Sequence, residues 1–277
     1  VAELVPTVIT SESQARQAFG AGSMLHGQLA AYLDNDKVTE VVAIAQDDAG
    51  AAVKASGTIT FAAGLATEDG VVALYVAGRK IAVAVSEGDD EDAVAAAVAA
   101  AINAESLSYV SSTVALNVVT ITAKNGGLAG NEIDVRFNYE STDSFPDGVS
   151  GVVVALSGGA TNPDLDDVLA ILPETQYNII AHPYIDASNL TKLENELGDR
   201  FGPIRQNDGV AFCASIDTLA NLTTLGNGRN SQHNSIMGAA GPSAPWEWSG
   251  AYAAQVSKSA QADPAKPFQT LPLLGIY

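Results

Sequence analysis

The sequence has 277 residues, of which 47% are hydrophobic and 16% charged, a balance typical of a folded globular protein and not of a disordered one. A chain of this length can form one large domain or two modest ones. Its 13 basic and 32 acidic residues give a formal net charge of −19. Such a surface repels phosphate, so we expect no direct binding to nucleic acid. The acidity serves solubility or tunes how copies of the protein approach one another.

Cysteine content and hydropathy narrow the class further. Cys213 is the single cysteine, which excludes an internal disulfide and suggests a reducing compartment. No stretch approaches the length of a membrane span and no signal peptide opens the sequence, so we expect no direct membrane partner. The sequence starts at Val1 and stops shortly after a Pro-containing segment, which suggests a trimmed fragment.

The first fifty residues predict two helices and a strand. Residues 11–14, Ser-Glu-Ser-Gln, have the spacing of a capping box, and a helical face follows before Gly20. A second helix is expected from Ser23 to Leu33. Glu40–Gln46 predicts a buried strand of the core.

Between about Ala55 and Leu156 the sequence becomes rich in strands. Alternating runs occur at Thr58–Phe61, Val71–Val76, Lys80–Val85, Tyr109–Val114, Val118–Thr122, Ile133–Tyr139 and Val152–Leu156. A tight hairpin turn is expected at Gly78-Arg79. One helix, from about Asp90 to Asn103, interrupts the strands, with an apolar stripe of Val94, Val98, Ala101 and Ile102. This block indicates a separate α+β module inserted into a loop of an outer fold.

The chain then returns to the first pattern. Asn162 and Pro163 predict the cap and first turn of a helix that Pro173 ends. Tyr177–Ala181 predicts a short buried strand that stops before Pro183. An amphipathic helix follows, capped by Asp186 or Ser188 and stopped by Gly202-Pro203, with Leu190, Leu193, Leu197 and Phe201 on one face.

The last third continues the alternation of strand and helix. Val210–Ala214 and Ser235–Met237 predict strands. Between them Asp217 is expected to cap a helix that carries Leu219, Leu222 and Leu225. A long helix is expected from Trp246 to about Gln261, opened by Pro245. Of the two tryptophans that begin it, we expect one in the core and the other facing outward or lying under a loop.

The pattern as a whole predicts an α/β protein. Residues 1–54 and 157–277 are expected to form a discontinuous core domain with a mainly parallel sheet and flanking helices. Residues 55–156 are expected to form an inserted β-rich α+β domain.

Candidate chemistry is sparse. His26, His182 and His233 are not spaced from one another, or from other ligands, as a metal site requires. One enzymatic hypothesis stays open: His182, Asp186 and Asp208 lie near strand ends, where open parallel sheets bind ligands. We otherwise expect no catalytic, metal-binding or cofactor-binding residue.

Three further segments suggest sites but have simpler explanations. The glycine-rich residues 126–130 lack the lysine of a phosphate-binding loop, and Asn131 is expected to begin a strand, so a turn is the better interpretation. Residues 157–159, Ser-Gly-Gly, precede a helix but have no basic neighbour. The acidic run Glu87–Asp92 lacks the ligand pattern of a calcium loop and suits a helix N-terminus.

Several separate segments resemble one known family. They are Arg200-Phe-Gly-Pro-Ile-Arg-Gln206, Leu225-Gly-Asn-Gly-Arg-Asn230, Pro245-Trp-Glu-Trp248, Asp263-Pro-Ala-Lys-Pro-Phe-Gln-Thr-Leu-Pro272 and Lys124-Asn-Gly-Gly-Leu-Ala-Gly-Asn131. Together they resemble the contractile tail sheath protein of Mu-like bacteriophages and prophages, over essentially the whole chain. Members of that family extend beyond both ends of this sequence, which fits a fragment without the N-terminal arm and the C-terminal region.

The resemblance implies a structural subunit of the virion tail, assembled in the host cytoplasm. Sheath subunits stack as rings around a tail tube, linked by arms that add strands to neighbouring sheets, and contract as nearly rigid bodies. The implied partners are other sheath subunits, the tail tube protein, and the baseplate and tail terminator proteins. The implied role involves no enzymatic activity. Without its arms the fragment is expected to be monomeric.

Overall fold

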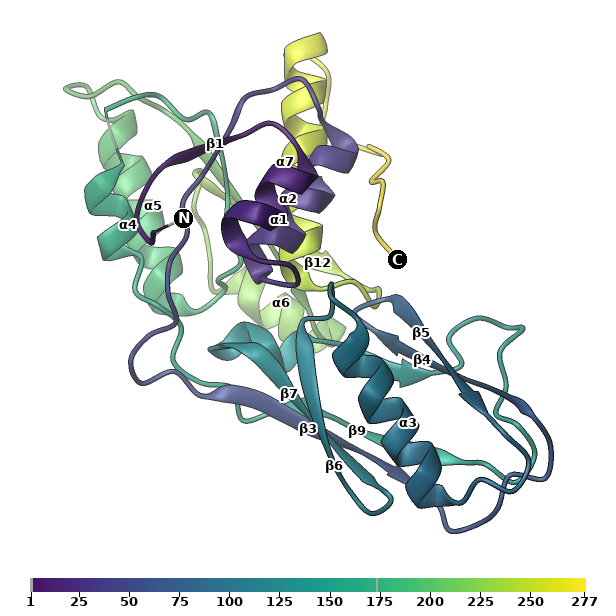
Figure 1. Ribbon diagram of the computed structural model, residues 1–277. Coiled ribbons are helices and arrows are strands. Elements are labelled where there is room, and N and C mark those ends of the chain that lie inside the picture. Colours follow the sequence, from purple (N-terminus) through teal and green to yellow (C-terminus); the bar gives the residue numbers. More distant parts are fainter. Residues whose placement is uncertain (1, 173) are drawn as a thin grey trace. The chain divides into compact units, whose positions relative to one another are not determined.

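The computed structural model describes residues 2–172 and 174–277, and within them the fold is mixed α/β with seven helices and four sheets (Figure 1). The chain divides into two compact units, Val1–Gly50 with Asn162–Tyr277, and Ala51–Thr161. The expected domain limits at residues 54 and 157 fall inside the second unit, because Val53 pairs with Ala160 there.

The first unit contains six helices and five strands. The helices are α1 (Glu12–Phe19), α2 (Met24–Asn35), α4 (Asp166–Ile171), α5 (Ala187–Phe201), α6 (Leu219–Asn227) and α7 (Pro245–Ala262). The strands are β1 (Thr7–Ile9), β2 (Val41–Ala43), β10 (Ile179–Ala181), β11 (Val210–Ile216) and β12 (Asn234–Ala239).

Its strands form two sheets. β10, β11 and β12 pair in parallel in that order, as expected for strands joined through helices. β2 pairs instead with β1, in an antiparallel ladder that joins Ile9 to Val41. The prediction of a core strand over Glu40–Gln46 was therefore too long and missed its partner, because a three-residue strand such as β1 has too few residues to show an alternation.

Alternate residues of the parallel sheet face two apolar clusters. Ile179, Ala181 and Phe212 pack with α2 and α7 on one face. Ile180 and Ala211 pack with Leu193 and Leu197 of α5 on the other. Strands covered on both faces are apolar at successive positions, which is why β10 and β11 have no polar alternation in the sequence.

Most helix starts follow the expected capping. The side chains of Ser11, Ser23 and Asp186 accept the main-chain N–H groups of Gln14, His26 and Asn189. The capping box at Ser11 is only half formed, since Gln14 Oε1 accepts the Thr10 N–H at 2.9 Å rather than the N–H of Ser11.

Two predicted caps are wrong. α4 begins at Asp166, and Asn162 instead donates its side-chain amide to Asp186 at 2.7 Å. α6 is capped by Thr218, one residue after the predicted Asp217. The predicted apolar face of α6 is not buried either, because Leu219 is 81% exposed. The predicted stop at Pro173 lies outside the described residues.

The second unit is built from antiparallel strands around helix α3 (Glu91–Ala104). Its strands are β3 (Lys54–Phe61), β4 (Gly70–Val76), β5 (Arg79–Val85), β6 (Val110–Ala115), β7 (Val118–Gly126), β8 (Val135–Phe137) and β9 (Gly151–Ser157). They form one sheet in the order β6-β7-β3-β9 and another in the order β5-β4-β8. Asp90 caps α3, and Val94, Val98 and Ile102 are buried as predicted.

Two turns in this unit differ from prediction. The β4–β5 hairpin turns at Ala77 and Gly78, both with positive φ, rather than at Gly78-Arg79. Two successive left-handed residues match the twist of a two-residue hairpin. Residues 128–132 form a 3₁₀ helix, so Asn131 does not begin a strand.

Helices α2 and α7 lie side by side at unusually close range (Figure 1). A Cβ added to Gly250 would lie 2.3 Å from the main-chain oxygen of Gln28. The Gln28 side chain donates to Ser249 Oγ at 2.8 Å, and both residues are buried. The contact therefore depends on small residues at the start of α7.

Replacing Gly250 with alanine should lower the free energy of unfolding by about 1–3 kcal/mol, because the helices must separate to admit the methyl group. Gly198→Ala in α5 is the matched control: nothing lies within 4 Å of its added Cβ, and the better helix propensity should raise stability by up to about 1 kcal/mol. Urea denaturation checks both. Equal stability of the Gly250→Ala variant and the parent would contradict the close packing.

Candidate functional site

The three residues of the enzymatic hypothesis do not form one site: His182 and Asp186 both follow β10, whereas Asp208 lies at the other end of the parallel sheet. His182 follows β10 at its C-terminal end, whereas Asp208 precedes β11 at its N-terminal end, and the register pairs Ile179 with Val210. Asp208 is exposed and accepts the Gln176 side chain at 2.6 Å. Asp186 caps α5 and accepts a hydrogen bond from Asn162. The two carboxylates therefore already have structural partners, at opposite ends of the parallel sheet.

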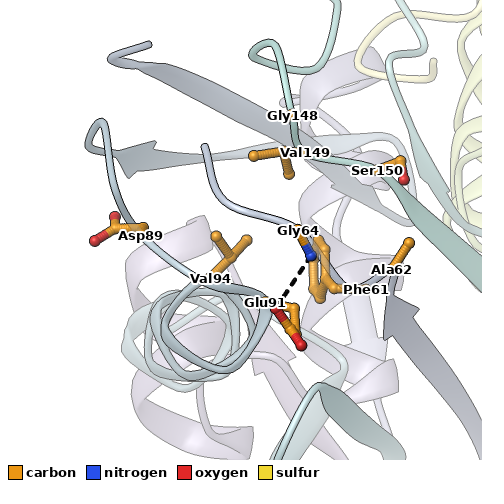
Figure 2. A pocket seen from close by; sticks show the side chains of 9 residues that line it. All are labelled: Phe61, Ala62, Gly64, Asp89, Glu91, Val94, Gly148, Val149 and Ser150. Atoms are coloured by element: carbon orange, nitrogen blue, oxygen red, sulfur yellow. Dashed lines mark hydrogen bonds between the residues drawn. The ribbon is translucent and has the colours of Figure 1, made fainter. Parts of the chain in front are cut away.

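None of these three side chains lines either of two hollows found among the described residues. One, of about 10 Å³, lies in the second unit between Phe61, Val94 and Val149, where Glu91 accepts the Gly64 N–H at 3.2 Å (Figure 2). That volume suits about one water molecule. The other is a wide, open depression of the first unit, lined by Glu194, Asn195, Gly198, Asn230, Ser231, Gln232 and His233. Neither resembles an enclosed substrate pocket.

Burial explains the state of His182. Its side chain is 5% exposed. Burial lowers the pKa of His182 to about 4, against weaker opposing effects of Asn234, the main chain at Tyr184, and Asp186. Burial likewise raises the pKa of Tyr184, and Asp48 and Asp186 raise it further. His182 is therefore a neutral core residue at neutral pH, unsuited to take up a proton there.

The other two histidines also have structural surroundings. His26 is buried in α2, with Nε2 3.1 Å from Glu12 Oε1. His233 precedes β12, and its ring lies 5.5 Å from the ring of Phe201. Phe201 is itself 56% exposed, contrary to its predicted place on the inner face of α5. No group of three or more His, Cys, Asp or Glu in the described ranges could hold a metal ion.

One segment that carries the resemblance fixes the end of α5. Arg200 is 2% exposed, and its Nε donates to Glu196 Oε1 at 2.8 Å. Its guanidinium also reaches the carbonyls of Leu172 and Thr175, each at 3.4 Å. Arg205 joins from the following turn, 3.0 Å from Glu196 Oε1. This charged group ties α5 to the chain that precedes β10.

A second segment that carries the resemblance, Leu225–Asn230, fixes the C-terminal end of α6. Arg229 donates to Thr191 Oγ1 at 3.0 Å and to the carbonyl of Ala187 at 2.9 Å, and it lies 3.4 Å from Glu194. Arg229 thus connects the loop after α6 to the first turns of α5. Arg200 and Arg229 thus both make contacts within this chain.

The third segment opens α7. Pro245 is the first helical residue, and Glu247 Oε2 accepts the Ala244 N–H at 3.1 Å. Trp246 is 1% exposed, whereas Trp248 is half-buried and lies under the loop at Gly241. The expectation of one core tryptophan and one beneath a loop is confirmed.

Sequence analysis missed a buried amide that holds the last residues. Asn35 is 3% exposed, and its side chain exchanges two hydrogen bonds with the main chain of Leu274, at 2.8 and 2.9 Å. The same amide bonds Ala31 O and Gln255. Tyr277 N donates to Ser243 Oγ at 2.9 Å. A single polar residue at a helix end carries no sequence signal of this role, since the bond spans more than two hundred residues.

The segment before this anchor is open to solvent. Residues 261–270 are exposed throughout, including most of the Asp263–Pro272 segment that carries the resemblance. Large apolar side chains are exposed elsewhere in the first unit too, with Ile204 at 96% and Leu219 at 81%. Exposed apolar side chains on a compact unit are candidates for contact with a partner.

Comparison with known proteins identifies the class. Residues 158–277 match the family model described as the phage tail sheath protein central domain. Over 264 residues the chain is 34% identical to the Mu-like prophage FluMu tail sheath protein of Haemophilus influenzae. The resemblance inferred from the sequence is confirmed. The alignment covers 95% of this chain and 54% of that relative, so the chain spans about half the relative's length.

The helices of the described residues were also compared with the requirements of a membrane span. None of them has the length and apolar character needed to cross a membrane.

Arg200→Met should lower the free energy of unfolding by about 2–3 kcal/mol, because it takes a buried donor away from Glu196 and from the carbonyls of Leu172 and Thr175. Arg205→Met is the matched control. Arg205 is more exposed than Arg200, and its surface ion pairs should contribute at most about 1 kcal/mol. Thermal and urea unfolding measure both. A loss for Arg205→Met as large as that for Arg200→Met would contradict the role of burial.

The depressed pKa of His182 predicts a loss of stability in acid. In the unfolded chain this imidazole takes up a proton near pH 6.5, whereas the folded state resists protonation down to about pH 4. Between these values only the unfolded state binds the proton, so the free energy of unfolding falls as pH falls.

The matched measurement compares the parent with His182→Leu at pH 7 and pH 4. The two proteins differ only at residue 182, so the difference between their pH dependences reports on His182. The variant should gain about 3 kcal/mol relative to the parent on moving from pH 7 to pH 4. Parallel stability curves would show that His182 carries no such penalty.

Proposed function

We propose that the protein is a structural subunit of a phage or prophage contractile tail sheath. The observation that carries this proposal is the 34% identity to a tail sheath protein over 95% of the chain. The match of residues 158–277 to the sheath central domain supports it independently of the remaining residues. The failure of His182, Asp186 and Asp208 to converge removes the support for the enzymatic alternative.

Such a subunit works through contact free energy and not through bond making. Subunits polymerise as rings around a tail tube, and the extended lattice is a kinetic trap. On firing, each subunit rotates as a nearly rigid body into a shorter, wider lattice that drives the tube through the host envelope. The internal clamps of Arg200 and Arg229 support this scheme, because rigid-body motion requires that a subunit keep its shape while its neighbours change.

We further propose that the first unit is the sheath core domain and faces the tube, with the second unit displayed outward as an inserted domain. The chain enters the second unit near Gly50 and leaves it near Asn162, as an insertion requires. Density of an assembled tail that placed residues 55–156 against the tube would refute this placement.

The partners follow from the same proposal. They are other copies of the subunit, the tail tube protein, and the baseplate and tail terminator proteins at the two ends. Contact with nucleic acid or membrane is not part of the role. The protein would be found in the virion tail and, during assembly, in the host cytoplasm.

The full-length protein expressed alone should form tubular polymers, visible by negative-stain electron microscopy. Residues 1–277 alone should remain monomeric or weakly associated in light scattering at micromolar concentration, since the arms that link subunits in such a sheath lie outside them and a net charge of −19 makes copies repel. Raising the salt concentration screens that repulsion and should favour polymerisation of the full-length protein. Full-length protein that stays monomeric across the salt series would contradict the sheath role.

A further inference from the structure

Strand β10 has the composition of a central strand but lies at an edge. Its residues Ile179, Ile180 and Ala181 are apolar, and they face apolar clusters on both sides of the sheet. Apolar residues at successive positions are typical of strands with neighbours on both edges in parallel sheets. Within the residues that the structure describes, however, β10 pairs only with β11, and each of its three residues is only half-buried.

The main chain of β10 has one unpaired edge. Asn178 O accepts the Val210 N–H at 3.0 Å, and the His182 N–H donates to Phe212 O at 3.1 Å. Main-chain groups alternate along a strand, so the N–H and C=O groups of Ile179 and Ala181 point away from β11. The shortness of β10 and Pro183 just after it limit this edge, but none of the three residues of β10 is a lysine or a proline.

Strand β2 belongs to the same core without pairing to β10. Val41 and Ala43 pack in the cluster that contains Ile179 and Ala181, on the layer of α2 and α7. The two strands lie in different sheets, so no ladder joins them. β2 pairs only with β1, which leaves its second edge unpaired as well.

The two strands run in the same direction. Asp48, after the end of β2, is near enough to raise the pKa of Tyr184, after the end of β10. Thr39, before β2, contacts Ser257 and Gln261 near the end of α7. Because α7 returns from the C-terminal end of β12, its last turns lie at the N-terminal ends of the parallel strands. β2 and β10 therefore begin at the same side of the core and end at the same side.

We propose that β2 and β10 border a vacant strand position, filled in the full-length protein by an extended apolar segment of its own chain from outside residues 1–277. One added strand would join β1-β2 and β10-β11-β12 into a single sheet over α2 and α7. The relative is long enough to supply it, since this chain spans 54% of its length.

A segment of the same chain is favoured over a strand from a neighbouring subunit. The two borders belong to the main apolar cluster of the first unit, which a subunit needs before it assembles. An apolar edge left open until assembly would promote edge-to-edge aggregation of free subunits. A covalently attached strand fills the position at any protein concentration.

Hydrogen exchange of the Ile179 and Ala181 amides tests the proposal, in residues 1–277 and in the full-length protein, both kept monomeric by dilution. The two amides should exchange rapidly in residues 1–277 and at least about tenfold more slowly in the full-length monomer. The His182 amide, bonded to Phe212 O, is the internal reference and should be protected in both. Rapid exchange of Ile179 and Ala181 in the full-length monomer would overturn the proposal. Protection that appears only in the polymer would assign the strand to a neighbour and equally overturn it.

A proline variant provides a second readout. Ala181→Pro removes an N–H that does not pair with β11, so residues 1–277 carrying it should keep His182 protected. In the full-length monomer the same change should abolish the protection of Ile179. Ile236→Pro is the matched control: the Ala211 N–H bonds His233 O, which by alternation places the Ile236 N–H on the outer edge of β12, and Ile179 should remain protected. If proline prevents folding, the exchange comparison of the unmodified proteins still decides. These outcomes do not depend on polymerisation and so do not test the sheath role.

Discussion

The close approach of α2 and α7 is the contact on which the first unit depends. Gly250 admits the Gln28 carbonyl at a distance that no side chain would permit. Two buried amides, Gln28 and Asn35, then connect the helices through Ser249 and Gln255. Each amide is buried with its partner already in place, so its desolvation is compensated. The same layer supports β10 and β11 through Phe212 and Tyr252, whose rings meet at 4.9 Å.

This layer also explains how residues distant in sequence become one unit. Leu274 is held by Asn35, at the end of α2, and Thr39 contacts Ser257 and Gln261 in α7. Hydrogen bonds of this range restrain parts of the chain that no local propensity could bring together. Such internal restraints hold the shape of the unit, which supports the proposed role as a body that moves without deforming.

Much of the fold could be predicted where periodicity or capping was strong. The helices α2, α3, α5 and α7 have apolar positions at helical spacing or a side-chain cap at the expected residue. Strands β3, β5 and β7 alternate between buried and more exposed positions because one face of each is solvated, whereas β4 is buried at successive positions. The family resemblance rested on loops and helix ends such as Arg200–Gln206, and its arginines hold the fold together.

What could not be predicted has physical causes. β1 is too short to show a period, and the apolar face of α6 is only partly covered, since Leu222 lies against Gly238 of β12 whereas Leu219 is exposed. Asn162 matched the pattern of a helix cap, but its side-chain amide donates a hydrogen bond to Asp186, which lies 24 residues further along the chain. His182 follows its strand and Asp208 precedes its own, so the two residues lie at opposite ends of the parallel sheet. The register of the two strands, which decides this, cannot be read from the sequence.

The edge of β10 separates two ways of building a sheath subunit. If the apolar cluster shared by β2 and β10 is closed within one chain, the first unit is a finished body before assembly, and neighbours add only surface contacts. If a neighbour closes it, assembly and folding are coupled, and the stability of a subunit depends on protein concentration. The half-burial of Ile179 and Ala181, within a cluster that also holds Phe212, favours the first way.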